Sequence, residues 1–347
     1  MRTLLLLFVI VITLPGCSTL TYYLDAVNGH AGILNQQRPV SEVIKDPGTR
    51  DAVRQALIQL QQARRFAVDV LLLPDNDSYR YYADIGREYA VWNVIATPEL
   101  SVKPRQWCFL FAGCLNYRGY FAEYKAQAYA QQLQQQGDDT HVAGARAYST
   151  LGWFDDPLLN TMLLKNEASR LGVLFHELAH QKIYIEDDPA FNEGFAVFVQ
   201  QEGVRRRFEA QGRHEEVDRY RQTVARRARF HGLLLETREK LARLYASQQP
   251  AAVKREQKQQ HFADLKQAYR QLKQQWNGYD GYDEWMQQPL NNAHLALIAT
   301  YREQVDRFEK LLDHYNGDLT AFYAEVERLA KLSPEQRKTA LINNVDE

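Results

Sequence analysis

The sequence lacks an excess of either charge. Its 347 residues include 42 lysines and arginines and 43 aspartates and glutamates, so the net charge is −1 with histidine neutral. A chain without a strong field does not gather nucleic acid, and we expect no nucleic-acid partner. The hydrophobic share of 45% and the charged share of 24% are ordinary globular values, and the length suffices for one large domain or two smaller ones.

The apolar run at the start of the chain is too short to cross a membrane comfortably. Residues 4–14 are apolar, follow Arg2, and have the length of a signal peptide's hydrophobic core. The letters LPGC then end at Cys17, and a small residue followed by cysteine resembles a bacterial lipobox. This resemblance implies a signal peptide at 1–16, cleavage before Cys17 and lipid on that cysteine. An uncleaved anchor or an ordinary secretory signal is the alternative.

A lipid on Cys17 would attach the protein to a membrane of the bacterial cell envelope. Ser18 follows the cysteine. By analogy with lipoprotein sorting, this residue favours the outer membrane, with the protein facing the periplasm.

Cysteine is scarce, with three in the whole chain. If Cys17 is acylated, Cys108 and Cys114 remain as an even pair in an oxidising compartment, and the stretch CFLFAGC would close a small disulfide loop. Two free thiols are the alternative. We expect no metal site from this pair, because no histidine or further cysteine lies near it in sequence.

The hydrophobic pattern divides the chain after the signal peptide into three segments. Residues 17–75 predict helices, because apolar residues recur there at helical spacing. Aromatic and β-branched runs between 78 and 120 predict strands, a helix follows over 121–136, and the stretch THVAGARAYSTLGW predicts one more strand. We therefore expect an α+β core over residues 76–203, with a small sheet packed beside helices.

Strand signals are weak from residue 204 onward, which predicts a helical region over 204–347. The stretches VRRRFEAQGRHEEVDRYRQTVARRARFHG and KREQKQQHFADLKQAYRQLKQQW are typical of long, solvated amphipathic helices. We expect them to form a protruding polar hairpin. The more apolar end of the chain predicts two packed helices interrupted at Asn316-Gly317-Asp318.

The stretch LGVLFHELAHQKIYIEDDPAFNEGFAVF carries the strongest chemical signal. His176 and His180 are four residues apart, so on a helix they project from one face and can converge on a zinc ion. Glu177 stands beside them and can take a proton from a water that the metal activates. The flanking residues are almost continuously apolar, and a buried helix rarely carries three ionisable side chains without partners.

A third metal ligand is expected further along the same stretch. A catalytic zinc usually has three protein ligands and one open position. Glu193 lies in a second predicted helix, after a turn at Asp187-Asp188-Pro189, and proline suits the first turn of a helix. The turn would bring Glu193 back toward His176 and His180.

The pattern HELAH…NEGFA resembles the gluzincin metallopeptidases, whose third ligand is a glutamate on a following helix. More widely, blocks from TYYLDAVNGHAGIL through WCFLFAGCLNYRGYF to NNAHLALIATY and GDLTAFY resemble a bacterial lipoprotein family assigned as zinc aminopeptidases. The resemblance implies a gluzincin-like helix pair that binds one Zn²⁺ through His176, His180 and Glu193, with Glu177 as catalytic base. The implied function is hydrolysis of peptide or protein substrates in the cell envelope.

Gluzincins also hold the oxyanion of the transition state with a tyrosine or histidine. The candidates here are Tyr117, Tyr148, Tyr301 and His294, and Arg118 could hold a substrate carboxylate. The chain has 20 tyrosines, so a buried structural role is the alternative for each tyrosine.

One residue of the large aminopeptidases is missing. Their strand before the zinc helix carries Gly-Ala-Met-Glu-Asn, whose glutamate grips the free amine of the substrate. Here Gly144-Ala145 is followed by Arg146-Ala147-Tyr148, and Glu167 is the nearest candidate to replace that glutamate. The alternatives to an aminopeptidase are an envelope endopeptidase, another zinc hydrolase, and a lipid-anchored scaffold with a structural metal.

Overall fold

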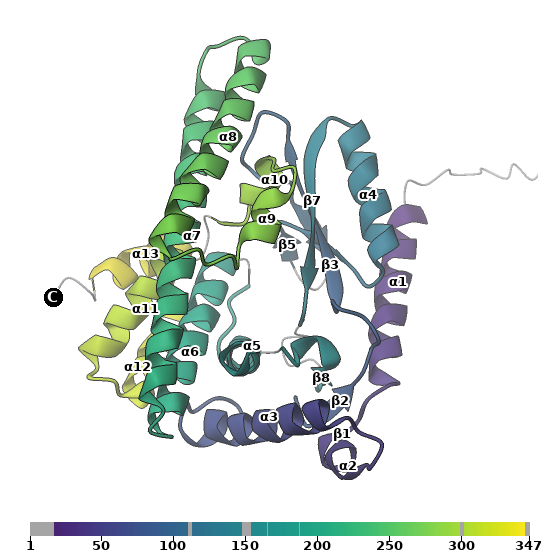
Figure 1. Cartoon of the computed structure of the whole chain (residues 1–347), viewed down its shortest axis with the longest axis vertical. Helices are drawn as coiled ribbons and strands as arrows, with labels where there is room; N and C mark the ends of the chain where they lie inside the picture. Colours follow the sequence, from purple (N-terminus) through teal and green to yellow (C-terminus); the bar gives the residue numbers. More distant parts are fainter. Residues whose placement is uncertain are drawn as a thin grey trace, which may run out of the picture.

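The computed structural model describes residues 17–109, 113–147, 154–164, 166–186, 188–298 and 302–343 (Figure 1). The α+β class predicted from the sequence is confirmed, because short strands form small sheets among a majority of helices. No described helix combines the length and the apolar character that crossing a membrane requires.

Helices dominate the segment before the first long strand, as the spacing of its apolar residues predicts. They are α1 (Cys17–Leu34), α2 (Val40–Lys45) and α3 (Asp51–Asp69). In α3 the buried side chains recur every three or four residues, and Leu57 and Leu60 are fully buried. This stripe faces the core, where the rings of Phe66 and Phe175 lie 6.3 Å apart between centroids.

The described strands form three sheets where the sequence led us to expect one. The first has the order β1-β2-β8, the second β6-β3-β7, and the third is a β4-β5 hairpin. Their bounds are β1 Arg38–Pro39, β2 Tyr81–Ala83, β3 Val91–Pro98, β4 Trp107–Phe109, β5 Gly113–Leu115, β6 Arg118–Tyr120, β7 Asp138–Ala145 and β8 Leu158–Leu159. Most strands have only two or three residues, which is too short to join the sheets into one.

The second sheet carries one apolar face against a helix. β3 and β7 pair antiparallel along their whole length, from Val91 opposite Ala145 to Pro98 opposite Asp138. Helix α4 (Glu123–Gln135) packs on this sheet through small and apolar side chains, which include Trp92, Val94, Ala96, Ala126, Ala130 and Leu133. The strand pattern between 78 and 120 and the helix at 121–136 are both present as predicted.

The β4-β5 hairpin contains the two remaining cysteines. Cys108 and Cys114 face each other in its register and are joined by a disulfide bond. Of the two alternatives that the sequence left open, the structure has the disulfide and not the free thiols.

A packed helix pair forms the centre of the molecule. It consists of α5 (Glu167–Lys182) and α6 (Pro189–Glu209). The side chain of Asp188 caps α6 by accepting from the Phe191 amide at 3.1 Å. Asn192 holds the connector between the helices, because its amide accepts from the Ile185 N–H at 2.8 Å and donates to the Ile185 carbonyl at 2.7 Å. Both bonds are partly buried, and they fix the start of α6 against the end of α5.

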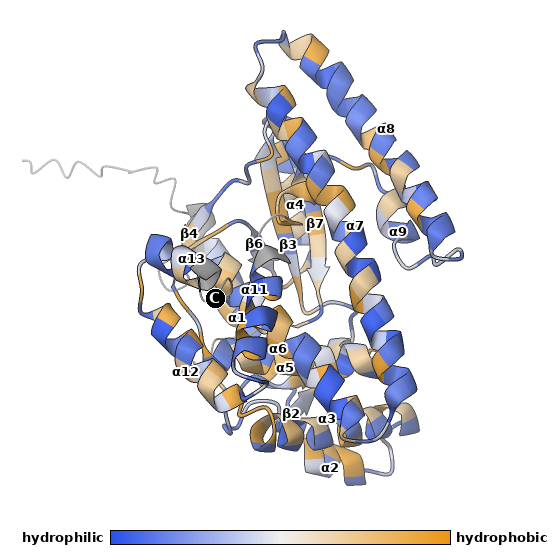
Figure 2. Cartoon of the chain, turned by 90° about the vertical axis from the view of Figure 1, so that its left-hand side faces the viewer, coloured by the Kyte–Doolittle hydropathy of each residue, from blue (hydrophilic) through white to orange (hydrophobic). Residues whose placement is uncertain are grey.

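A long helical hairpin extends from the body of the molecule (Figure 1). It consists of α7 (His214–Ala246) and α8 (Ala251–Gln275), which pack on each other through apolar residues that include Phe230, Leu241 and Leu265. Much of the surface of α8 is hydrophilic (Figure 2). In the first half of α8, near the loop that joins it to α7, Lys258 donates to the Glu99 carbonyl at 2.9 Å and pairs with Asp139 at 2.6 Å, which ties the hairpin to the second sheet.

The remaining helices close the fold. They are α9 (Asp283–Gln287), α10 (Asn292–Leu295), α11 (Arg302–His314), α12 (Leu319–Ala330) and α13 (Pro334–Asn343), with a short 3-10 turn η1 (Asn160–Met162) earlier in the chain. The predicted break at 316–318 separates α11 from α12. Buried Phe308 and Phe322 pack on Phe195 of α6. Arg337 of α13 is buried and forms an ion pair with Asp188, the cap of α6.

Gly194 is the point of closest approach between α6 and α11. A Cβ atom built on Gly194 would lie 2.3 Å from Cβ of Gln304 and 3.5 Å from its Cα. Because the Cβ of Gln304 is fixed to its own backbone, Gly194→Ala would have to push α11 away. We expect a loss of about 1–3 kcal/mol in the free energy of unfolding, measured by urea denaturation.

Gly32→Ala in α1 is the matched control, because no atom lies within 4 Å of the added Cβ. Alanine lowers the conformational freedom of the unfolded chain, so this variant should be as stable as the wild type or more stable by up to about 1 kcal/mol. Equal stability of Gly194→Ala and Gly32→Ala would contradict the close packing of α6 on α11.

Candidate metal centre

Two histidines and a glutamate converge where α5 packs on α6. The Nε2 atoms of His176 and His180 lie 3.1 Å apart. The Glu193 carboxylate reaches both, at 3.4 Å from Nε2 of His176 and 3.5 Å from Nε2 of His180. Within the described ranges, these three residues form the one group of three or more potential metal-binding side chains whose ligand atoms lie within 4.8 Å of one another.

The geometry of the cluster fits a small tetrahedral ion. Ligands that bind zinc at about 2.0–2.1 Å in a tetrahedron lie about 3.3 Å from one another. The three separations here, between 3.1 and 3.5 Å, span that value. Two imidazoles and a carboxylate are also the donor set of a catalytic zinc site. The three residues therefore fit the metal that the sequence predicts.

The cluster is buried on its histidine side and opens on its glutamate side. The side chain of His180 is 8% exposed and that of Glu193 is 36% exposed. Burial and the nearby His176 lower the pKa of His180 to about 4. Burial is the largest single influence on the Glu193 carboxyl group and raises its pKa. The hydrogen bond to His176 and the charges of both histidines together lower this pKa by more, so the net shift is downward. A neutral imidazole and an ionised carboxylate are the forms that bind a metal.

Glu177 lies beside the cluster without being one of its three ligands. Burial is the largest influence on its carboxyl group and, together with the negative charges of Glu193 and Asp156, raises its pKa to about 7. The charge of His176 acts in the opposite direction but is outweighed. A carboxyl group whose pKa lies near neutral pH can both accept and return a proton.

Tyr117 is the oxyanion candidate that the structure brings near the cluster. It stands between β5 and β6 and packs with Ile95 and Ala293. Burial raises the pKa of its phenol to about 12, and the charges of Glu193 and Glu177 add to the shift. Tyr184 also lies near the cluster and was not predicted from the sequence. Its ring centroid lies 6.5 Å from that of His180, and its phenol adds to the rise in the pKa of Tyr117.

Among the described residues, Arg118 packs on tyrosine rings and not on His176, His180 or Glu193. Its guanidinium group lies over the rings of Tyr22, Tyr129 and Tyr120, at 4.1, 4.7 and 5.6 Å from their centroids. These contacts attach α1 to the second sheet. Tyr148 and Tyr301, the other two tyrosine candidates, lie outside the described residues.

Two further candidates have other partners. His294 caps α10 through Asn291 and stacks on His141, with 4.0 Å between the ring centroids. Glu167, considered as a binder of the substrate amine, accepts two hydrogen bonds from Arg213 at 3.0 and 3.1 Å. This ion pair joins the start of α5 to the start of α7.

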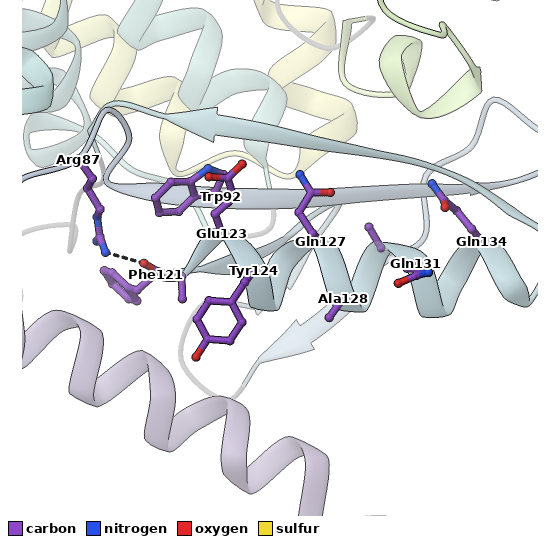
Figure 3. Close-up of a pocket in the computed structure, with 11 residues that line it drawn as sticks. Arg87, Trp92, Phe121, Glu123, Tyr124, Gln127, Ala128, Gln131 and Gln134 are labelled. Atoms are coloured by element: carbon purple, nitrogen blue, oxygen red, sulfur yellow. Dashed lines mark hydrogen bonds between the residues drawn. The ribbon is translucent and has the colours of Figure 1, made fainter.

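A surface hollow lies elsewhere, between α4 and the second sheet (Figure 3). It has a volume of about 970 Å³, and its lining includes Trp92, Tyr124 and Arg87, which donates to the Phe121 carbonyl at 2.6 Å. Glu123 is the single acidic residue of its lining, which does not include His176, His180 or Glu193. The hollow therefore contains no part of the candidate metal centre.

Fold and site together describe an α+β protein whose central helix pair carries two histidines and two glutamates in one partly buried group. The chain belongs to the family described as "Putative aminopeptidase", whose model matches residues 21–341. That description indicates a peptidase. No curated protein and no solved structure matches the chain.

Proposed function

We propose that the protein is a zinc-dependent peptidase of the cell envelope and that it removes residues from the free amino end of peptides. The family description supports a peptidase. The observation that carries the zinc dependence is the convergence of His176, His180 and Glu193, with the buried carboxyl group of Glu177 alongside. A structural metal site has no need of a base beside its ligands, which favours catalysis over a scaffold.

The two Nε2 atoms and the Glu193 carboxylate would hold one zinc ion. When bound, the zinc would supply a Lewis acid that polarises the peptide carbonyl and makes a coordinated water more acidic. Glu177 accepts a proton from the attacking water and passes it to the leaving amine. Tyr117, whose raised pKa keeps its phenol protonated at neutral pH, is the best-placed donor to the developing oxyanion.

The mode of cleavage depends on a group that binds the substrate amine. The glutamate that the large aminopeptidases carry is missing after Gly144-Ala145, and Arg146 in this region pairs with Glu88 at 2.8 Å. Glu167 is unsuited to the task because it pairs with Arg213. The aminopeptidase assignment therefore depends on the family description, and an endopeptidase is the competing outcome.

A comparison of free and blocked peptides tests the proposal. The full chain would be purified in detergent, its zinc content measured, and a peptide library offered with free or acetylated amino ends. We expect one zinc per chain and products shortened by one residue from free ends alone. Internal cuts in acetylated peptides would show that the protein is an endopeptidase and not an aminopeptidase. A protein that binds one zinc but cleaves no peptide would exclude the peptidase function.

We also propose that lipid on Cys17 attaches the protein to the envelope membrane. Cys17→Ser removes the thiol that carries the lipid. We expect this variant to lose incorporation of a labelled fatty acid and to leave the membrane fraction, while Thr19→Ala keeps both. A Cys17→Ser protein that still incorporates the label would exclude lipidation at this residue.

A further inference from the structure

The polar atoms around His176 point to a partner on the neighbouring helix. Nδ1 of His176, the ring nitrogen away from Glu193, is buried and has no partner in full hydrogen-bonding geometry. The hydroxyl oxygen of Tyr220 on α7 is buried in the same way. The side chain of Gln200 lies near both residues, and its amide nitrogen lies close to Gly172, one helical turn before His176. An amide between two such atoms can serve both of them.

Helical spacing places Gln200 there. It follows Glu193 on α6 by seven residues, which is about two turns, so both side chains project from nearly the same side. On α5, Gly172 precedes His176 by one turn and leaves room for the amide. A Cβ atom on Gly172 would lie 3.1 Å from both Cγ and Nε2 of Gln200. A larger residue at 172 would force the Gln200 side chain to shift by at least a few tenths of an ångström.

We propose that Gln200 is a positioning residue for the metal centre. Its Oε1 accepts from Nδ1–H of His176, and its Nε2 donates to the hydroxyl oxygen of Tyr220. The first bond fixes the tautomer of His176 in which Nε2 carries the lone pair that faces Glu193, which is the form that binds a metal. The inference rests on the proposed function, because it assigns Gln200 a role toward the metal.

One orientation of the amide serves both buried atoms. When Nε2 of His176 carries the lone pair that faces Glu193, Nδ1 carries the proton and needs an acceptor, which only the amide oxygen of Gln200 can be. The amide nitrogen then faces the hydroxyl oxygen of Tyr220, which can accept from it.

The assignment gives α7 of the hairpin a role at the metal site. Tyr220 belongs to α7 and packs at the edge of the main core. Its hydroxyl group holds the far end of the Gln200 amide, so the position of α7 determines how firmly Gln200 orients His176. Residues on three helices, α5, α6 and α7, thus form one connected group behind the ligands.

The test is the zinc affinity of Gln200→Leu in the full chain in detergent, measured by competition with a chromogenic chelator. Loss of a partner behind a ligand typically weakens metal binding about 10–100-fold, and we expect a change in that range. Gln200→Glu keeps an acceptor, so its affinity should stay close to that of the wild type. Tyr220→Phe keeps the His176 bond and should weaken binding less than Gln200→Leu does.

Gln181→Leu is the matched control. Gln181 is also a glutamine at the helix pair, but its amide bonds to Asn76 at 2.7 Å and Ser78 at 3.2 Å, away from the ligands. The Gln181→Leu variant should have a lower free energy of unfolding than the wild type and an unchanged zinc affinity. Equal affinities of Gln200→Leu and Gln181→Leu, or a loss for Gln200→Glu as large as for Gln200→Leu, would overturn the inference alone. A wild type that binds no zinc would overturn the proposed function with it.

Discussion

Glu177→Gln is expected to lower the rate of peptide hydrolysis by about 10²–10⁴-fold, the usual contribution of general acid–base catalysis. Glutamine has nearly the same shape as glutamate but cannot accept a proton from water. Glu177 is not one of the three ligands of the cluster, so the variant should still bind one zinc per chain. The measurement is kcat on a free-amino peptide, together with zinc content.

The control is Glu186→Gln, an exposed glutamate in the connector between α5 and α6. It removes the same charge from the same region and should leave kcat unchanged. If Glu177→Gln kept full activity with zinc bound, Glu177 would not be the base. If it lost zinc as well as activity, Glu177 would be a ligand, contrary to the geometry of His176, His180 and Glu193.

The convergence of His176, His180 and Glu193 could be predicted because these residues are close in sequence. His176 and His180 are one helical turn apart, so the period of the helix alone brings their side chains together. Glu193 needed one further inference, namely that the turn ending at Pro189 sends the chain back along the first helix. The α+β class followed in the same way, from the local periods of the apolar residues.

The surroundings of the cluster could not be predicted because they depend on long-range packing. Arg118 carries a charge, which suggested a substrate contact, but its surroundings come from Tyr22, Tyr120 and Tyr129 in separate elements. Glu167 pairs with Arg213 of another helix. No local pattern reports such pairings, because each depends on how whole helices and strands are placed against one another.

The position of Gln200 on the same side of α6 as Glu193 could have been predicted from the sequence. Its spacing of seven from Glu193 was available as a signal that both lie on one side of a helix. However, glutamine is frequent in this chain, and nothing local separates Gln200 from the glutamines of the polar hairpin. Only the packing of Gly172 against the Gln200 side chain distinguishes it.

Glu193→Gln is expected to remove the stabilisation of the fold by zinc. The variant replaces the one anionic ligand of the cluster by a neutral amide, which is a poor ligand for zinc. A metal that binds the folded chain alone stabilises it by about 2.7 kcal/mol at 100 times its dissociation constant. The wild type should therefore gain about this much in the free energy of unfolding, measured by urea denaturation with and without zinc. Glu193→Gln should gain almost nothing at the same zinc concentration.

The matched control for this experiment is Glu202→Gln, on the same helix. The side chain of Glu202 is 11% exposed, and it pairs with Arg205 and Arg206, each at 2.6 Å. Its loss should weaken the metal-free fold and leave the gain from zinc intact. Because Glu193→Gln and Glu202→Gln each remove one negative charge from α6, a difference in the zinc gain isolates the ligand role of Glu193. An equal gain in both variants would mean that zinc binds elsewhere, and the assignment of the metal centre to His176, His180 and Glu193 would fail.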